Sequence, residues 1–238
     1  MKFAIILPWS PTNDIHRQRS FRWVTRRYQK AFPDAEIVLG QCDPTKPFNR
    51  SQAILNGAMQ TDARILVCAD ADVWTNIRSA VQVTDSMGWA VPHLMIHRLS
   101  LASTHEVLGG ATPHPGMSLA GGNARDMAPY RGNVSGTCLV IRRDALFDVP
   151  PDVRFIGWGQ EDQAWGTALR LLVGKPWRGK NPLYHLWHPP APRMDRVNGA
   201  PESAALWKRY VRCAHDPDRM RSLLNESKEL WHAQGIHP

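Results

Sequence analysis

The chain has 238 residues, of which 43% are hydrophobic, so it can bury a sizeable core in one domain and does not require a second. Its apolar N-terminal run is short and stops at Pro8, which fits neither a signal peptide nor a membrane span and leads us to expect a cytoplasmic protein. The net charge of +8 allows a polyanionic partner, and the four widely spaced cysteines form no Cys-x-x-Cys metal motif.

The first part of the chain alternates predicted strands and helices. Apolar runs predict buried strands over residues 3–7, 36–40 and 64–69. Apolar residues at helical spacing predict helices over 14–31 and 49–60. This order favours a parallel sheet with a nucleotide-sized crevice at the carboxyl ends of its strands.

The helix predicted over 14–31 is amphipathic, and Asn13 or Asp14 can cap it. Its apolar residues recur at helical spacing from Phe21 to Ala31. Its basic residues are Arg17, Arg19, Arg22, Arg26, Arg27 and Lys30. We interpret them as the solvated face of the helix in preference to a nucleic-acid-binding surface, and note that a positive field also attracts an anionic nucleotide.

The second part continues the pattern around one long loop. A helix and then a strand are expected between 75 and 92, a strand over 136–141 and a short helix over 143–147. A further helix is predicted over 161–173. Residues 108–133 are rich in Gly, Pro, Asn and Met without a clear period, which predicts a surface loop that covers an acceptor.

Beyond the prolines at 189–192 the pattern changes. The residues that follow are polar, and we expect them to form a mobile segment. Helical pieces are then predicted around 203–213 and 219–231.

An Asp-x-Asp motif, Asp70-Ala71-Asp72, directly follows the apolar run that ends at Ala69. Such a motif is often only a turn or a helix cap. At the end of a buried strand, however, both side chains reach the crevice. There Asp72 is a candidate ligand for Mg²⁺ or Mn²⁺, and Asp70 is a candidate contact for the ribose or a bound water.

His185 and His188 stand three residues apart, close enough for one or both to complete a metal shell. The alternative is that each is a hydrogen-bonded core histidine. Imidazole ligands beside carboxylate oxygens favour Mn²⁺ weakly over Mg²⁺. A zinc hydrolase is a competing interpretation, but no His-Glu-x-x-His motif accompanies the pair.

Glu161 and Asp162 begin a predicted helix behind the turn Gly157-Trp158-Gly159. They could simply be ordinary carboxylates at a helix N-terminus, where the helix dipole favours negative charge. Their place behind two glycines and an aromatic ring instead indicates an acid/base site. Because a carboxylate at a helix start is expected to keep a low pKa, we assign Asp162 as a general base and Glu161 as an anchor for acceptor hydroxyls.

With these residues identified, the chain resembles the GT-A-fold inverting glycosyltransferases, most closely the β-1,4-galactosyltransferases and bacterial chondroitin-type synthases. The strings Phe-Asn-Arg and Gly-Trp-Gly-x-Glu-Asp are far more specific than Asp-x-Asp. The matching segments, in chain order, are Ala4–Pro8, Phe48–Asn56, Asp70–Asp72, Gly157–Asp162 and His185–His188.

The resemblance implies donor-binding roles for several residues. The family's Phe-Asn-Arg segment holds the uridine and phosphates, which implies this role for Phe48 and Arg50. The loop after the first strand acts likewise, which implies Pro8 and Trp9. The tryptophan of Gly-Trp-Gly lines the donor and acceptor sites, which implies Trp158.

The resemblance also implies the metal ligands and the base. The second carboxylate of the family's Asp-x-Asp binds Mn²⁺ and falls on Asp72, and a histidine ligand falls on His188. Where the galactosyltransferases carry a methionine ligand, this chain has His185, which leaves the choice of metal open. The family's Glu-Asp pair binds and deprotonates the acceptor and falls on Glu161 and Asp162.

We therefore expect a single α/β domain of GT-A fold, with a mostly parallel sheet flanked by helices. Residues 1–190 would be the catalytic domain, with a nucleotide-binding half over 1–75 and an acceptor half over 76–190. Residues 191–238 would be a mobile loop and a C-terminal helical appendage. The resemblance implies that the segment over 189–201 closes over the site.

The predicted function is the metal-dependent, inverting transfer of a hexose or N-acetylhexosamine from a UDP-sugar to a hydroxyl acceptor. The acceptor stays open between a glycan, a protein and a lipid-linked sugar, and nucleic acid is possible but not favoured. The alternatives are a nucleic-acid-base glycosyltransferase, a non-catalytic lectin-like protein of the same fold and, third, a metal-dependent hydrolase.

Overall fold

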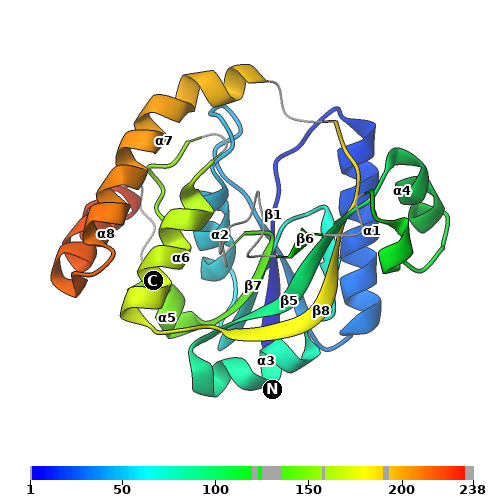
Figure 1. Ribbon diagram of the computed structural model, residues 1–238, viewed down its shortest axis with the longest axis horizontal. Coiled ribbons are helices and arrows are strands. Elements are labelled where there is room, and N and C mark those ends of the chain that lie inside the picture. The colour runs from blue at the N-terminus through cyan, green and yellow to red at the C-terminus, as the bar shows by residue number, and fades with distance from the viewer. Residues whose placement is uncertain (1, 120–122, 125–135, 157–158, 190–192, 234–238) are drawn as a thin grey trace.

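The computed structural model describes residues 2–119, 123–124, 136–156, 159–189 and 193–233. Among these residues, seven strands form one sheet in the order β2-β1-β3-β7-β5-β8-β4, and β6 pairs with β5 (Figure 1). The strands are β1 (Phe3–Pro8), β2 (Glu36–Gly40), β3 (Ile65–Ala69), β4 (Val73–Thr75), β5 (Trp89–Arg98), β6 (Asn123–Ala124), β7 (Cys138–Arg142) and β8 (Trp177–His185).

Strand direction changes across the sheet. Strand β1 runs parallel to β2 and β3, and β5 runs parallel to β8. Strand β7 is antiparallel to both β3 and β5, so the two parallel groups point the same way on either side of it. The short β4 closes the far edge antiparallel to β8. The carboxyl ends of β3 and β8 therefore lie at the same edge of the sheet.

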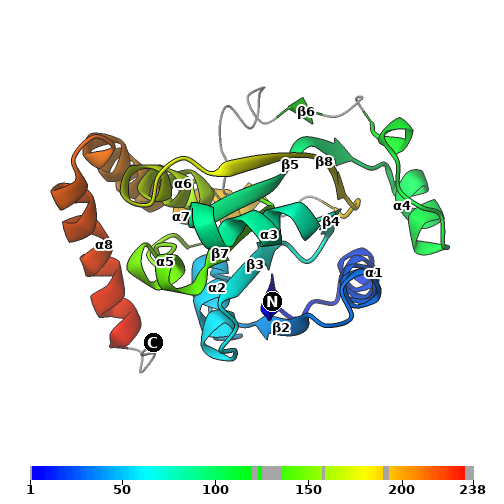
Figure 2. The ribbon, with the colours of Figure 1, turned by 90° about the horizontal axis from the view of Figure 1, so that it is seen from below.

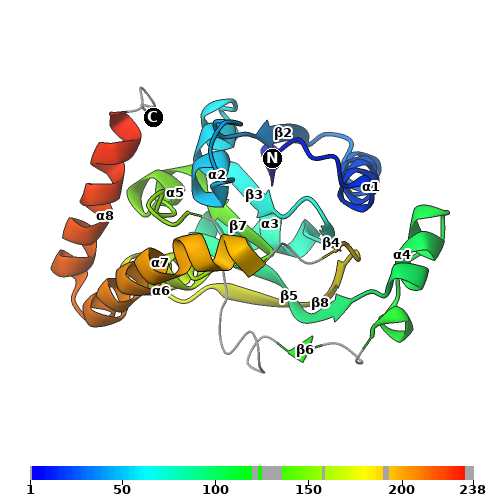
Figure 3. The ribbon, with the colours of Figure 1, turned by 90° about the horizontal axis from the view of Figure 1, so that it is seen from above.

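Helices cover both faces of the sheet (Figures 2 and 3). One face carries α2, α5, α6, α7 and α8, and the other carries α1, α3 and α4. The helices are α1 (Ile15–Ala31), α2 (Arg50–Met59), α3 (Arg78–Met87), α4 (Leu101–Leu108), α5 (Arg143–Asp148), α6 (Glu161–Leu172), α7 (Arg193–Cys213) and α8 (Pro217–His232), and a 3-10 turn, η1, spans Pro115–Met117.

Alternation along the strands produces the two cores. On β1, Ala4 and Ile6 belong to the core that contains residues of α2 and α6, while Ile5 and Leu7 belong to the core on the other face, which contains residues of α1 and α3. Because both faces are covered, the central strands consist almost wholly of apolar residues, which is the pattern that predicted them. The expected α/β class with helices on both faces is confirmed, but the sheet is mixed and not mostly parallel, because β7, β4 and β6 run antiparallel to their neighbours.

Side-chain caps form at the starts of the first two helices, and the one at α1 was predicted. The Asp14 side chain accepts hydrogen bonds from the backbone N–H groups of His16 and Arg17, so it caps α1. The Asn49 side chain accepts from the Gln52 N–H and caps α2. These caps fix where each helix begins, and they place Arg50 at the first turn of α2.

The C-terminal helices belong to the main core. Leu206 and Tyr210 of α7 and Trp231 of α8 are buried in the same cluster as α6. The prediction of a loop after the prolines is wrong from residue 193 onward, because α7 begins there and continues past Pro201. Of the loop expected over 108–133, the structure describes residues 108–119, which include the end of α4 and the turn η1, and the short strand β6, and the remainder lies outside the described residues.

A buried ionic network joins these helices to the segment before α6. The carboxylate of Asp152, which is 1% exposed, accepts hydrogen bonds from the Arg154 guanidinium and, at 2.7 Å, from the Tyr210 hydroxyl. Arg154 also donates to Glu226 of α8. Because Val153 donates its N–H to Ser227 and accepts from the Asn49 side chain, the network fixes the segment to α2 as well.

None of the helices in the described part of the chain is both long enough and apolar enough to cross a membrane.

Candidate active site

The Asp-x-Asp motif lies in a turn held on two sides by backbone hydrogen bonds. The Asp70 N–H donates to the Thr137 carbonyl at 2.8 Å, just before β7, and the Val73 N–H donates to the Asp70 carbonyl at 3.2 Å. The Asp72 carbonyl accepts from the Leu186 N–H at 2.9 Å, just beyond β8. The motif is therefore fixed between β7 and β8 at the carboxyl end of β3.

Asp72, His185 and His188 form a group with the dimensions of a metal site. The Asp72 carboxylate lies 3.8 Å from His185 Nε2 and 3.2 Å from His188 Nε2. One ligand atom from each residue lies within 4.8 Å of the other two. Strand β8 brings the histidines here, because its last residue, His185, pairs with Val73 directly after the motif.

The ring orientation of His188 makes the group suited to a cation. His188 Nδ1 lies 2.7 Å from the Pro189 carbonyl oxygen, which can only accept a hydrogen bond, so Nδ1 carries the proton. In the neutral ring, Nε2 then presents a lone pair toward the Asp72 carboxylate. Two acceptors at 3.2 Å repel unless a proton or a metal ion lies between them.

Electrostatics keep Asp72 ionised. Burial opposes ionisation, but His185 and His188 outweigh it and lower the pKa of Asp72 to about 2. Burial lowers the pKa of His185 despite the Asp72 charge, so this ring is neutral near pH 7. Burial also acts to lower the pKa of His188, but its hydrogen bond to Asp72 raises it. A carboxylate and one neutral imidazole are thus available as ligands.

Asp70 does not join the metal group but forms a short ion pair with Arg50. Arg50 Nε donates to Asp70 Oδ1 at 2.6 Å, and the two side chains are 14% and 30% exposed. Burial opposes the Arg50 charge, but Asp70, Glu161 and Asp162 together raise its pKa. The buried Arg50 Nη2 has no hydrogen-bond partner among the described residues, so it retains a donor for a ligand.

Glu161 and Asp162 occupy the first turn of α6 behind an unusual backbone. Gly159 and Gln160 have φ values of 120° and 72°, in the left-handed region. The Asp162 side chain accepts from the Gln163 N–H at 2.8 Å. The Glu161 Oε2 is buried and has no hydrogen-bond partner among the described residues. Both carboxylates lie near enough to Arg50 to affect its pKa, which joins them to the Asp70 side of the site.

The pKa of Glu161 departs from the sequence-based expectation. Burial, reinforced by the Asp162 charge, raises the pKa of Glu161 to about 7 even though Arg50 acts against it. The expectation of a low pKa at the helix start is therefore wrong for Glu161, because desolvation outweighs the helix dipole. Glu161 is protonated below neutral pH and then offers a hydrogen-bond donor.

Replacing Glu161 by Gln will stabilise the metal-free protein at high pH. Between the ordinary glutamate pKa of 4.5 and about 7, the folded protein holds a proton that the unfolded chain releases, so stability falls as pH rises through that window. At pH 8 the ionised Glu161 lowers the free energy of unfolding by up to about 3 kcal/mol, and Glu161→Gln removes this loss. Urea unfolding in EDTA at pH 5 and pH 8 measures the difference.

The exposed Glu202 provides the control, since Glu202→Gln makes the same chemical change on the surface of α7. It should leave stability at both pH values unchanged. A Glu161→Gln protein that is no more stable than the wild type at pH 8 would contradict a buried, strained carboxylate at this position.

The remaining predicted donor residues lie near the ends of β1 and β2. Pro8 is the last residue of β1 and is buried, and the Trp9 N–H donates to the Gly40 carbonyl at 2.8 Å. The Trp9 ring stacks on Phe21 of α1 with centroids 4.2 Å apart. Phe48 is half-buried just before α2. Trp158 lies outside the described residues.

Two further residues border the site that the motifs did not single out. Arg17 of α1 donates to the Pro189 carbonyl at 3.4 Å, and its charge helps to lower the pKa of Asp72. Thr137 has a φ of 68° and presents its carbonyl to Asp70. In the sequence, Arg17 is one of six basic residues in the same helix, and nothing singles it out. A left-handed backbone at a threonine likewise has no signal in the sequence.

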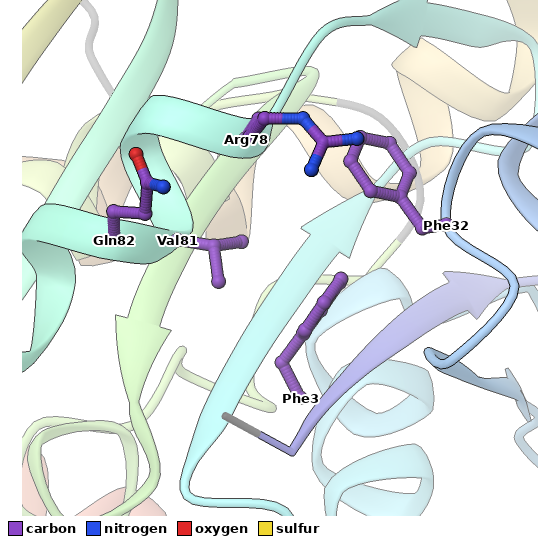
Figure 4. A pocket seen from close by; sticks show the side chains of 5 residues that line it. All are labelled: Phe3, Phe32, Arg78, Val81 and Gln82. Carbon is purple, nitrogen blue, oxygen red and sulfur yellow. The ribbon is translucent and has the colours of Figure 1, made fainter.

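Two hollows lie elsewhere on the molecule. One, of about 200 Å³, lies beside Phe3 at the beginning of β1, where Arg78 stacks over the Phe32 ring at 5.5 Å (Figure 4). The other, of about 470 Å³, lies between α1 and α4. Neither is lined by Asp72, His185 or His188, so the candidate site is defined by its polar groups and not by these hollows.

Comparison with known proteins identifies the fold. No protein-family model matches the sequence, and no curated protein matches it. Among solved structures, a variant of Drosophila β-1,4-galactosyltransferase 7 in complex with manganese, UDP-Gal and xylobiose is 16% identical, with a TM-score of 0.51 over 82% of this chain and 73% of that one.

Glucosyl-3-phosphoglycerate synthase from Mycobacterium tuberculosis, in complex with Mn²⁺, UDP and phosphoglyceric acid, is 11% identical. Its TM-score is 0.45, over 90% of this chain and 78% of that one. The likeness to the Drosophila structure shows that the chain has the GT-A fold expected from its motifs.

Proposed function

We propose that this GT-A-fold chain is a metal-dependent glycosyltransferase that moves a hexose or N-acetylhexosamine from a UDP-sugar to a hydroxyl acceptor with inversion. The observation that carries the proposal is the group of Asp72, His185 and His188, whose ligand atoms lie within 4.8 Å of one another. It lies at the carboxyl edge of the sheet, where open α/β folds bind nucleotides. The Drosophila structure of the same fold holds manganese and UDP-Gal.

The donor atoms of this group fit a divalent cation. Asp72 offers an ionised oxygen and His185 a neutral imidazole, and His188, with a proton on Nδ1, offers its Nε2 lone pair once the cation displaces the proton shared with Asp72. Two imidazoles beside one carboxylate favour Mn²⁺ over Mg²⁺. A bound Mn²⁺ supplies positive charge that stabilises the departing diphosphate.

Donor binding is assigned to the residues around Arg50. The unpartnered Arg50 Nη2 is suited to a phosphate oxygen, while its Nε stays on Asp70. Asp70 in turn would accept a hydrogen bond from a ribose hydroxyl. We assign the nucleotide contacts to Pro8, Trp9 and Phe48, and a role in lining the donor and acceptor sites to Trp158. The nucleotide-binding half would thus be residues 1–75.

Acceptor activation is assigned to α6. Asp162 would take the proton of the acceptor hydroxyl as its oxygen attacks the anomeric carbon opposite the UDP. Glu161, protonated below about pH 7, would donate a hydrogen bond to an acceptor oxygen from its buried position. Two adjacent carboxyl groups would thus have different roles, one as the base and one as a hydrogen-bond donor, a common arrangement in acid/base sites.

A panel of UDP-, GDP- and CMP-sugars tests the function, each added with and without Mn²⁺. We expect one UDP-sugar to raise the melting temperature only when Mn²⁺ is present, and to release UDP slowly by hydrolysis without an acceptor. Stabilisation by free sugars without nucleotide release would indicate a lectin-like protein. No response to any donor would exclude the glycosyltransferase proposal.

A further inference from the structure

The hollow between α1 and α4 carries a concentrated positive charge that the proposed chemistry does not use. It has a volume of about 470 Å³ and is lined by Arg19, Arg22, Arg26, Trp23 and His105. The three arginines lie three and four residues apart on α1, so their side chains share one face of the helix. All three are exposed, and Trp23 is half-buried among them.

Ion pairs among the described residues do not account for this cluster of arginines. Among the described residues, none of the three forms an ion pair, whereas Arg17 pairs with Asp14 and Arg27 stacks over Trp74. Like charges at this spacing weaken a helix by about 0.2–0.5 kcal/mol per pair. The arrangement therefore costs stability, which an anionic ligand would offset.

The hollow is connected to the candidate active site through a row of rings. His105 of α4 stacks with His16 of α1 at 6.2 Å, and His16 packs edge-on against Trp187 at 4.9 Å. Trp187 immediately precedes His188. From Arg17, which contacts Pro189, to Arg26 the helix rises about 14 Å. A ligand of a few sugar residues is long enough to cover that distance.

We propose that this hollow binds an acidic glycan, with the arginines on its charged groups and Trp23 against a sugar ring, and that the acceptor of the enzyme is such a glycan. The acceptor assignment rests on the proposed function. Aromatic faces suit the apolar faces of sugars, and arginine pairs with carboxylate, sulfate and phosphate groups.

Other anionic partners fit the hollow less well. Proteins that grip duplex DNA make about six to ten phosphate contacts, and three arginines in a hollow fall short of that number. A flat bilayer surface would not reach Trp23, which is half-buried in a concave site. A flexible acidic chain can enter the hollow and follow the helix.

The binding experiment titrates the protein into two fluorescein-labelled acidic glycans, oligogalacturonate and dextran sulfate. Neutral dextran, a 20-base-pair DNA and phosphatidylglycerol vesicles are then tested as competitors for the same site. We expect an acidic glycan to bind, with an affinity that falls as salt rises, and neutral dextran not to bind. Arg22→Gln combined with Arg26→Gln should weaken this binding by about tenfold.

The matched control is Arg212→Gln combined with Arg221→Gln, which removes the same charge from exposed positions on α7 and α8, at the opposite end of the molecule (Figure 3). It should bind like the wild type. Equal weakening in both double variants, or stronger binding to DNA or vesicles than to either glycan, would overturn the inference.

Hydrolysis of the UDP-sugar, measured without any acceptor, separates this inference from the proposed function. It should be unchanged in Arg22→Gln/Arg26→Gln, because neither residue belongs to the proposed catalytic group. If hydrolysis is absent in every protein while the arginine-dependent glycan binding persists, the proposed enzyme activity fails and the binding site stands. If hydrolysis is normal and no acidic glycan binds, the inference fails alone.

Discussion

Asp72→Asn will lose Mn²⁺-dependent donor binding, and sugar transfer will fall by about a thousandfold or more. The change removes the one carboxylate of the proposed metal group and leaves two imidazoles, of which His188 then loses the charge that raises its pKa. The amide keeps the volume of the side chain, so the loss reports on metal binding and not on a cavity.

Thermal unfolding measures this effect without turnover. For the wild type, Mn²⁺ at about a hundred times its dissociation constant should add about 2.7 kcal/mol of stability, which is about 5–10 °C for a chain of this size. Asp72→Asn should show no shift. Asp62→Asn, the same change at an exposed residue paired with Lys2, should keep the full shift. A Mn²⁺ shift that persists in Asp72→Asn would remove this residue from the metal site.

The central part of the fold could be predicted because its strands are buried on both faces. Ile65–Ala69 is apolar throughout, and such a run in front of Asp70 identifies both the strand and the edge where it ends. Strand β8 was not predicted. It carries Arg178 and Lys180 toward solvent and Pro182 within its length, so neither composition nor period marks it as a strand. This segment forms a strand because it pairs with β5.

The chemistry of the site was only partly predictable, because it too depends on contacts between segments that lie far apart in the sequence. The spacing of His185 and His188 pointed to a metal, but the lone pair on His188 follows from a contact with Pro189 that only the folded backbone defines. The raised pKa of Glu161 depends on its burial and on Asp162 and Arg50. Residues brought together from α2 and α6 leave no periodic signal in the sequence.

Asp162→Asn will lower kcat for transfer by about 10²- to 10⁴-fold while leaving the binding of the UDP-sugar and of Mn²⁺ unchanged. An amide cannot accept the acceptor proton, but it keeps the shape of the side chain and can still accept a hydrogen bond from the Gln163 N–H. The measurement is kcat and the KM for donor and acceptor, together with the Mn²⁺-dependent thermal shift.

Glu161→Gln is the matched comparison, because it makes the same change one residue earlier. If Glu161 is a hydrogen-bond anchor, Glu161→Gln should lower kcat far less than Asp162→Asn does and raise the acceptor KM only slightly, since the neutral amide resembles the protonated acid that burial favours and still donates a hydrogen bond. The reverse order, with the larger loss of kcat in Glu161→Gln, would reassign the base. A pKa of about 7 would then suit Glu161 for that role, so the pair of variants decides which carboxyl group takes the proton.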